Sequence, residues 1–194
     1  TANMGRIVLK QILSVKSGKQ SGSVDAVFTW LAPEGKPLLT ETRKTTYYSH
    51  PELRIIDYDF DFAAVDKVVF RDTKEGTFGV RVAESMRVER KNRKPEGHLV
   101  NSENQTDGAT WGKRAAWCDY YGPVNEKVVG VAIFDHPKNP RHPTWWHVRD
   151  YGLFAANPFG QHDFEKLPDK TAGNLVVPAG KSLTFRYRFY FHEG

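Results

Sequence analysis

At 194 residues the chain has the length of one domain, and its single cysteine, Cys118, excludes an internal disulfide and a multi-cysteine zinc site. The 28 basic residues are interleaved with 23 acidic ones, so the formal net charge of +5 indicates a mildly basic surface and not a nucleic-acid-binding one. No apolar run approaches the roughly 20 residues of a membrane span.

Apolar and polar residues alternate with a period of two along most of the chain, which predicts β-strands. The predicted strands, in chain order, cover residues 24–30, 54–62, 67–71, 77–86, 128–135 and 182–192. Turn signals that contain Pro or Gly separate them, and no long segment carries the apolar stripe of a helix. We therefore predict an all-β fold, one antiparallel β-sandwich domain over residues 1–194 with few or no helices.

The last predicted strand shows how alternation separates core from surface. One face carries the aromatic residues and the other carries the polar ones, namely Arg186, Arg188, Tyr190 and His192. Because one face must join the core, the polar face lies toward solvent or a cleft. Residues 87–98 form a basic run with the character of a solvated loop, and residues 98–116 are predicted to be a long polar loop.

The segment 134–160 holds three of the seven histidines and two of the five tryptophans, together with charged and amide side chains. This mixture of flat apolar surfaces and polar groups is typical of a binding pocket. His136, His142 and His147 are suitable metal ligands, but no HExxH or HxH spacing accompanies them. Hydrogen bonding to a polar ligand is the favoured interpretation. The alternatives are a metal site and a structural role in tying down a loop.

Histidine titrates near neutral pH, so an imidazole and a carboxylate in one cleft can act as a general acid–base pair. The candidate carboxylates are Glu75, Asp119, Asp135 and Asp150. Glu75 precedes a glycine between two predicted strands and has the alternative interpretation of a hairpin-turn residue. Asp119 alternates with Trp117 and Tyr121, which favours a position in a lined cleft.

Aromatic side chains are the third candidate feature. Trp145 and Trp146 must point to opposite faces of a strand, so we expect at most one of them in the core and the other beside a loop or cleft. Aromatic planes beside Asn, Asp, Arg and His suit sugar recognition, and the alternative is that the tryptophans fill the core. Cys118 lies in an aromatic strand and is interpreted as a buried, inert thiol.

Four segments together resemble one bacterial family, which bears the name methane oxygenase PmoA and is otherwise of unknown function. They are DTKEGTFGVRVA (72–83), WGKRAAWCDYYG (111–122), VAIFDHPKNPRHPTWWHVRDYGLFAANPFG (131–160) and RYRFYFHEG (186–194). An upstream His-His-Arg-Gly-Leu-Trp-like motif of the family is absent, and the chain starts at Thr1, so we expect the N-terminal part to be incomplete. The family name would require several apolar spans, which this chain lacks.

The resemblance implies a β-sandwich similar to the galactose-mutarotase-like superfamily, in bacteria that process sugars. It also implies site positions in this sequence: Glu75, Arg81, Trp117, Asp119, His136, Asn139, His142, His147, Arg149, Asn157 and His192.

Imidazole, guanidinium and indole groups in one β-rich chain predict a carbohydrate-active protein, with an isomerase, epimerase, hydrolase or lyase favoured over a binding protein. We expect His136 or His147 to protonate the ring or leaving oxygen and Glu75 or Asp119 to take the other proton. The expected binding residues are Arg81, Trp117, Asn139, His142, Trp146, Arg149, Asn157 and His192.

We expect a small or oligomeric carbohydrate as the partner, with no nucleic acid, no cofactor and no resident metal. A soluble protein is expected, and a periplasmic or secreted location is favoured over a cytoplasmic one. Two alternatives stay open: a noncatalytic carbohydrate-binding module and a metal-dependent oxidative enzyme. The approach of a histidine to Glu75 or Asp119 discriminates the acid–base enzyme from the binding module.

Overall fold

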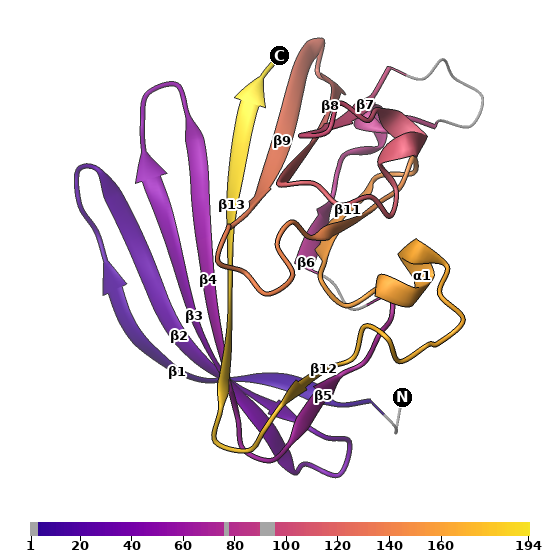
Figure 1. Cartoon of the computed structure of the whole chain (residues 1–194). Coiled ribbons are helices and arrows are strands. Elements are labelled where there is room, and N and C mark those ends of the chain that lie inside the picture. The colour runs from indigo at the N-terminus through magenta and orange to yellow at the C-terminus, as the bar shows by residue number, and fades with distance from the viewer. Residues whose placement is uncertain (1–3, 76–77, 90–95) are drawn as a thin grey trace. The chain divides into compact units, whose positions relative to one another are not determined.

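The computed structural model describes residues 4–75, 78–89 and 96–194. The chain forms two compact units, and each is built from segments far apart in the sequence (Figure 1). The first unit comprises residues 1–70 and 175–187, and the second comprises residues 71–174 and 188–194. The expected single domain over residues 1–194 stays a prediction.

The first unit is an antiparallel sheet of long strands. Their order is β1-β2-β3-β4-β13, with bounds Arg6–Lys16, Ser21–Leu31, Pro37–Ser49, Arg54–Ala64 and Ser182–Glu193. Strand β13 belongs to this unit only as far as Tyr187. A two-stranded sheet joins β5 (Val68–Phe70) to β12 (Leu175–Val177).

The alternation predicted for residues 54–62 is confirmed by the ring contacts of β4. Tyr58, Phe60 and Phe62 stack in one row, with centroids 6.0 and 6.1 Å apart. Phe62 also contacts Phe70 of β5 and Phe185 of β13, at 6.0 and 6.4 Å between centroids. The aromatic face of β4 therefore forms the core of this unit.

The second unit contains two sheets. One has the order β13-β9-β8-β7, with β9 at Lys127–Asp135, β8 at Trp117–Val124 and β7 at His98–Asn101. The other has the order β10-β11-β6, with bounds Trp145–Val148, Leu153–Asn157 and Phe78–Arg81. The short α-helix α1 (Gln161–Glu165) and the 3-10 turns η1 (Glu84–Met86) and η2 (Asp107–Thr110) complete the unit.

The two sheets of the second unit pack face to face through aromatic side chains. Tyr120 of β8 contacts Phe154 of β11 with ring centroids 5.9 Å apart, and Phe78 of β6 contacts Phe189 of β13 at 5.5 Å. Cys118 and Ile133 are completely buried. The predicted all-β, antiparallel fold with a sandwich and few helices is confirmed. In the described residues, no helix has the length and hydropathy of a membrane span.

Several predicted elements differ from the structure. Residues 98–116, expected to form a loop, contain β7 and η2, because His98–Asn101 pair with β8. The strand expected over 77–86 ends at Arg81. Arg81 pairs with Leu153, the first residue of β11, and the turn before β11 contains Gly152 with a φ of +94°. Of the predicted basic run 87–98, residues 90–95 lie outside the described part of the chain.

Two long strands, β1 and β3, were not predicted from the sequence. Strand β1 has register shifts between Leu9 and Gln11 and between Ile12 and Ser14, which break the period of two. Strand β3 carries polar side chains on both faces, including the buried Glu41, whose carboxylate accepts hydrogen bonds from Arg43 and Trp30. Both strands form because their neighbours pair with them.

Candidate functional site

A histidine–carboxylate pair lies on one sheet face of the second unit. Asp119 is in β8 and His192 is in β13, and His192 Nε2 lies 3.1 Å from Asp119 Oδ1. Their side chains are 15% and 18% exposed, so the pair is shielded but reachable from solvent. Both residues belong to the predicted site, but no local sequence pattern indicates that they contact each other across 73 positions.

Core packing on one face of β8 explains the placement of Asp119 on the other. Cys118 and Tyr120 point into the sandwich and are completely buried. Trp117, Asp119 and Tyr121 alternate with them and are half-buried. Because successive side chains of a strand point to opposite faces, burial of Cys118 and Tyr120 fixes Asp119 on the outer face.

Gly130 allows His192 to reach Asp119. Strand β9 lies between β8 and β13, and Gly130 sits on it directly beneath the imidazole. A Cβ at position 130 would lie 2.3 Å from His192 Nε2 and 2.9 Å from the Cβ of Tyr121. Glycine is therefore required for the close approach of the two side chains over the middle strand.

Aromatic side chains surround the pair on the same face. Tyr190 stacks on His192 with ring centroids 5.5 Å apart. Trp117 contacts Phe134 of β9 at 6.3 Å between centroids, and Phe134 is 37% exposed. These rings provide apolar surface next to the histidine–carboxylate pair, and flat apolar surface with a few polar groups is typical of a binding site.

His192 contacts two acceptor oxygens. Its Nε2 lies 3.1 Å from Asp119 Oδ1, and its Nδ1 lies 3.4 Å from the carbonyl oxygen of Glu193. Each contact is a hydrogen bond when the ring nitrogen that makes it carries a proton, and both are hydrogen bonds together only in the imidazolium. Asp119 orients the ring through Nε2, and Nδ1 is the ring nitrogen that lies away from Asp119.

The predicted histidine cluster is divided among several local networks. Asp135 is buried and accepts hydrogen bonds from Asn139 Nδ2 at 2.7 Å, from His142 Nδ1 at 2.7 Å and from the Thr144 backbone N–H at 3.0 Å. Burial raises the pKa of Asp135, and these hydrogen bonds act in the opposite direction. The network fixes the loop that follows β9, which favours the structural interpretation of Asn139 and His142.

His136 lies at the start of the same loop and has a local partner. Its Nδ1 accepts a hydrogen bond from the Lys138 backbone N–H at 3.1 Å. This contact caps the turn and leaves His136 outside the Asp135 network. The structure does not bring it into contact with Asp119 or Glu75 by any hydrogen bond or ion pair among the described residues.

Both ring nitrogens of the buried His147 are engaged. Its Nδ1 donates to the Lys74 carbonyl oxygen at 2.6 Å, and its Nε2 accepts from Arg149 Nε at 3.3 Å. Burial is the main cause that lowers the pKa of His147, with the charge of Arg149 acting in the same direction. Arg149 in turn lies over the Trp111 ring, 4.7 Å from its centroid. His147 is therefore a neutral side chain that holds the segment around Lys74.

Asn157 supports the same segment. Its Nδ2 donates to the carbonyl oxygens of Thr73 and Lys74, and its Oδ1 accepts from the Phe159 backbone N–H at 2.8 Å. Glu75 follows directly, with a side chain that is 71% exposed and 3.6 Å from Lys74 Nζ. The structure thus places Asn157 and His147 as supports of the turn that carries Glu75.

Trp145 and Trp146 do point to opposite faces, but the expectation that at most one is in the core is wrong. Both are buried. Trp146 packs against Phe154 and donates to the Ala115 carbonyl oxygen at 2.9 Å. Trp145 donates to Glu165 of α1 at 3.1 Å and lies under the Arg114 guanidinium. Both faces of β10 are covered, so alternation does not leave one tryptophan exposed. Arg81 is exposed and lies over the Tyr151 ring.

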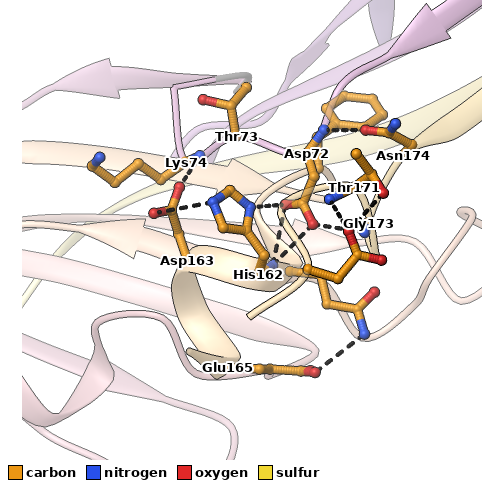
Figure 2. Close-up of polar contacts among 12 residues, drawn as sticks. Asp72, Thr73, Lys74, His162, Asp163, Glu165, Thr171, Gly173 and Asn174 are labelled. Atoms are coloured by element: carbon orange, nitrogen blue, oxygen red, sulfur yellow. Dashed lines mark hydrogen bonds and ion pairs between the residues drawn. The ribbon is translucent and has the colours of Figure 1, made fainter. Parts of the chain in front are cut away.

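A second polar cluster, centred on Asp72, was not identified from the sequence (Figure 2). The Asp72 carboxylate accepts backbone N–H groups of His162 and Gly173, the latter at 2.6 Å, and its Oδ1 lies 2.9 Å from His162 Nδ1. His162 Nε2 is also 3.6 Å from Asp163 Oδ1. Positions 90 and 101 residues away supply these contacts, so no local sequence motif indicates them.

Arg141 ties further segments to this cluster. Its guanidinium donates to the carbonyl oxygens of Pro158, Gly173 and Asn174 at 2.8, 2.6 and 3.1 Å. Burial lowers the pKa of Arg141, while the charge of Asp72 acts in the opposite direction. Asp72 and Arg141 therefore stabilise the loops around α1 and do not form an open site. Within the part of the chain that the structure describes, no group of three or more His, Cys, Asp or Glu side chains is arranged to hold a metal.

The model of a protein family of unknown function matches residues 1–194 of the chain. The chain belongs to the family DUF6807. No curated protein sequence matches it. The resemblance of its motifs to the PmoA-named bacterial family stays a prediction.

Solved structures similar to this DUF6807 chain are carbohydrate-related proteins at low identity. The alpha-galactosidases AgaA and AgaB of Geobacillus stearothermophilus have identities of 12% and 10% and TM-scores of 0.36 and 0.38. The match covers 98% of this chain but spans only 27% of each galactosidase. A putative aldose 1-epimerase of Escherichia coli K12 has 8% identity and a TM-score of 0.40, with 95% of this chain and 68% of the epimerase covered. At these TM-scores the similarities assign neither activity nor site residues.

The Asp72 cluster gives a prediction on the stability of this DUF6807 protein. We expect Asp72→Asn to lower the free energy of unfolding by about 2–3 kcal/mol, because it replaces a buried carboxylate that accepts backbone N–H groups of two distant segments and turns an amide donor toward these donors. Chemical denaturation measures the change. The control is Glu193→Gln, which removes an exposed ion pair with Lys127 and should cost no more than ~1 kcal/mol. Equal effects of the two substitutions would contradict the structural role of Asp72.

His147 gives a prediction on pH dependence. Its pKa is lower in the folded chain than the ordinary value of about 6.5, so the unfolded chain binds a proton that the folded chain does not. This contribution to stability is complete above about pH 6.5, falls as the pH drops below that value, and levels off below the folded-state pKa. We expect His147→Asn to flatten the pH dependence of the unfolding free energy between about pH 7 and pH 5. An unchanged slope, measured beside the exposed His50→Asn variant, would argue against a neutral buried His147.

Proposed function

We propose that this DUF6807 protein is a carbohydrate-active enzyme that carries out acid–base chemistry on a sugar or glycoside at Asp119 and His192. The observation that carries the proposal is the 3.1 Å contact between Asp119 Oδ1 and His192 Nε2 on a shielded sheet face. A carboxylate within hydrogen-bond reach of an imidazole is the arrangement that an acid–base enzyme requires and a binding module does not.

In the proposed mechanism, His192 exchanges the proton and Asp119 positions it. His192 Nδ1 accepts a proton from a sugar hydroxyl, while the proton on Nε2 stays directed at Asp119. The negative carboxylate stabilises the imidazolium that forms, as it does in a catalytic triad. When the proton returns, the same group acts as the general acid toward the ring or leaving oxygen.

The aromatic pair Trp117 and Phe134 supplies the surface for the apolar face of the sugar. Both rings lie on neighbouring strands of the same sheet face as Asp119, at a register in which Trp117 is opposite Phe134. A planar ring beside a proton-transfer group holds the sugar through its C–H face while its hydroxyls meet polar groups. In this proposal His136, His147 and Glu75 do not transfer protons.

A noncatalytic carbohydrate-binding module is the second candidate function. The aromatic surface of Trp117, Phe134 and Tyr190 favours it, because stacking surface alone is sufficient for sugar affinity. The two functions predict different effects of removing the His192 imidazole. A module retains its function without a proton-transfer group, whereas an enzyme does not.

The proposal is tested with a panel of sugars, whose binding and conversion are followed by NMR. Free aldoses, oxidised sugars and glycosides are incubated with the wild-type chain, and binding and turnover are both measured. We expect His192→Asn to lower kcat by about 10²- to 10⁴-fold, with affinity changed much less, because the substitution removes proton transfer and keeps a polar side chain. Asp119→Asn should lower kcat as well, and Trp117→Ala should mainly weaken binding. The control is His50→Asn, an exposed histidine of the first unit.

Two outcomes of this panel would overturn the proposal. Binding without turnover by the wild-type chain would leave the noncatalytic module as the function. Turnover that survives His192→Asn at the wild-type rate would exclude the Asp119 and His192 pair as the catalytic group.

Gly130 provides an independent prediction for the same site. We expect Gly130→Ala to lower kcat because its methyl group would displace the imidazole from Asp119. In the His192→Asn background the same substitution should have a much smaller effect, since the pair is already broken. Kinetics of the double-mutant cycle measure the coupling. Additive effects would show that Gly130 acts through the fold alone.

A further inference from the structure

We propose that Arg149 binds a carboxylate-bearing ligand at a second site, on the outer face of the three-stranded sheet β10-β11-β6. Trp146 and Val148 are buried on the inner face of this sheet, and Arg149 follows Val148 in the chain. Because successive side chains point to opposite faces, Arg149 extends from the outer face. Asp119 and His192 belong to the other sheet of the unit, so this site does not depend on the proposed function.

The half-buried side chain of Arg149 is anchored by its neighbours. Its guanidinium lies over the Trp111 ring, 4.7 Å from the centroid, and its Nε donates to His147 Nε2 at 3.3 Å. His147 is itself fixed, because its Nδ1 donates to the Lys74 carbonyl oxygen at 2.6 Å. A guanidinium that is already held in place loses less conformational entropy when it binds a ligand.

Most of the hydrogen-bonding capacity of Arg149 is unused within residues 4–75, 78–89 and 96–194. A guanidinium has five N–H donors, and in this part of the chain Arg149 donates only through Nε. Two other guanidiniums of the unit differ, since Arg141 donates to three backbone carbonyl oxygens and Arg114 to two. Arg114 also lies over an indole ring, that of Trp145 at 4.6 Å, so stacking on tryptophan does not by itself leave the terminal amino groups without partners.

The charges around Arg149 favour a singly charged anion. Among the described residues no carboxylate forms an ion pair with Arg149: Glu75 pairs with Lys74 at 3.6 Å, and Asp150 interacts with Arg149 only at longer range. Two parallel N–H groups match the two oxygens of a carboxylate or of a phosphate. The Glu75 and Asp150 carboxylates repel a phosphate dianion more strongly than a carboxylate, so a carboxylate suits this site better.

Arg81 adds a second positive charge to the same face. It pairs with Leu153 of β11, and the Arg149 backbone N–H donates to the Leu153 carbonyl oxygen from the other side. Directly opposed residues of neighbouring strands project from one face, and two strand spacings separate the Cα atoms of Arg81 and Arg149 by roughly 10 Å. Arg81 is exposed, and its guanidinium lies over the Tyr151 ring. Its charge therefore attracts an anion toward Arg149 without a contact between Arg81 and the ligand.

Titration of the wild-type chain with sodium glucuronate at about pH 7 tests the site. The indole N–H signal of Trp111 in a proton–nitrogen NMR spectrum reports binding, because the Arg149 guanidinium lies over that ring, and Trp111→Phe identifies the signal. We expect glucuronate to shift the signal and glucose to leave it unchanged. Acetate distinguishes the source of the carboxylate: equal affinity for acetate assigns a simple carboxylic acid, and tighter binding of glucuronate assigns a sugar acid.

Substitutions separate the guanidinium from its charge. We expect Arg149→Lys to raise the Kd of glucuronate by about tenfold or more, because lysine keeps the charge and loses the two parallel donors. Arg81→Gln should raise the Kd by ~2-fold at low salt, as expected for two charges roughly 10 Å apart in water, and should have no effect at high salt. The matched control is Arg114→Lys, whose guanidinium also lies over a tryptophan but donates to backbone carbonyl oxygens.

Four outcomes would overturn the carboxylate site. They are an equal response to glucose and glucuronate, tighter binding of inorganic phosphate than of glucuronate, equal effects of Arg149→Lys and Arg114→Lys on the Kd, and no binding of any carboxylate. Thermal unfolding verifies that the variants fold. The titration measures no turnover, so each of these outcomes leaves the proposed chemistry of Asp119 and His192 standing.

Discussion

The strict alternation of side chains along β8 is the constraint on which the site depends. Cys118 and Tyr120 fill the interior of the sandwich, so Asp119 and Tyr121 must stand on the other face. A slip of one residue in the register would bury the carboxylate and expose the core residues. The packing of Cys118 and Tyr120 therefore determines the position of Asp119, and this position does not depend on the contacts of the carboxylate itself.

A second constraint is the burial of charge around α1. The Asp72 carboxylate is completely shielded and is matched by His162 and by backbone N–H groups of distant segments (Figure 2). A buried charge without such partners would destabilise the fold by several kcal/mol, so the loops that supply them are held together. Asp135 does the same for the loop after β9. Many polar residues that suggest a functional site in the sequence instead hold loops together through buried hydrogen bonds.

Most of the strand content could be predicted, because alternation is a local property that the sequence displays directly. Strands β1 and β3 were missed where bulges or polar residues on both faces hide the period. Asp119 and His192 are both recognised as candidates from the sequence, but their pairing is not. This relation depends on which strands are neighbours, and the strand order β13-β9-β8-β7 is not encoded within any one segment.

The sequence by itself determined the fold class, the exclusion of a disulfide, and the concentration of imidazole and indole in the segment 134–160. Only the tertiary structure decided that this segment is largely a buried support, with both tryptophans in the core and His147 hydrogen-bonded at both nitrogens. It also decided that Gly130 brings His192 to Asp119. The physical reason is that hydrogen bonds and close packing act between residues adjacent in space, whereas periodicity reports only neighbours along the chain.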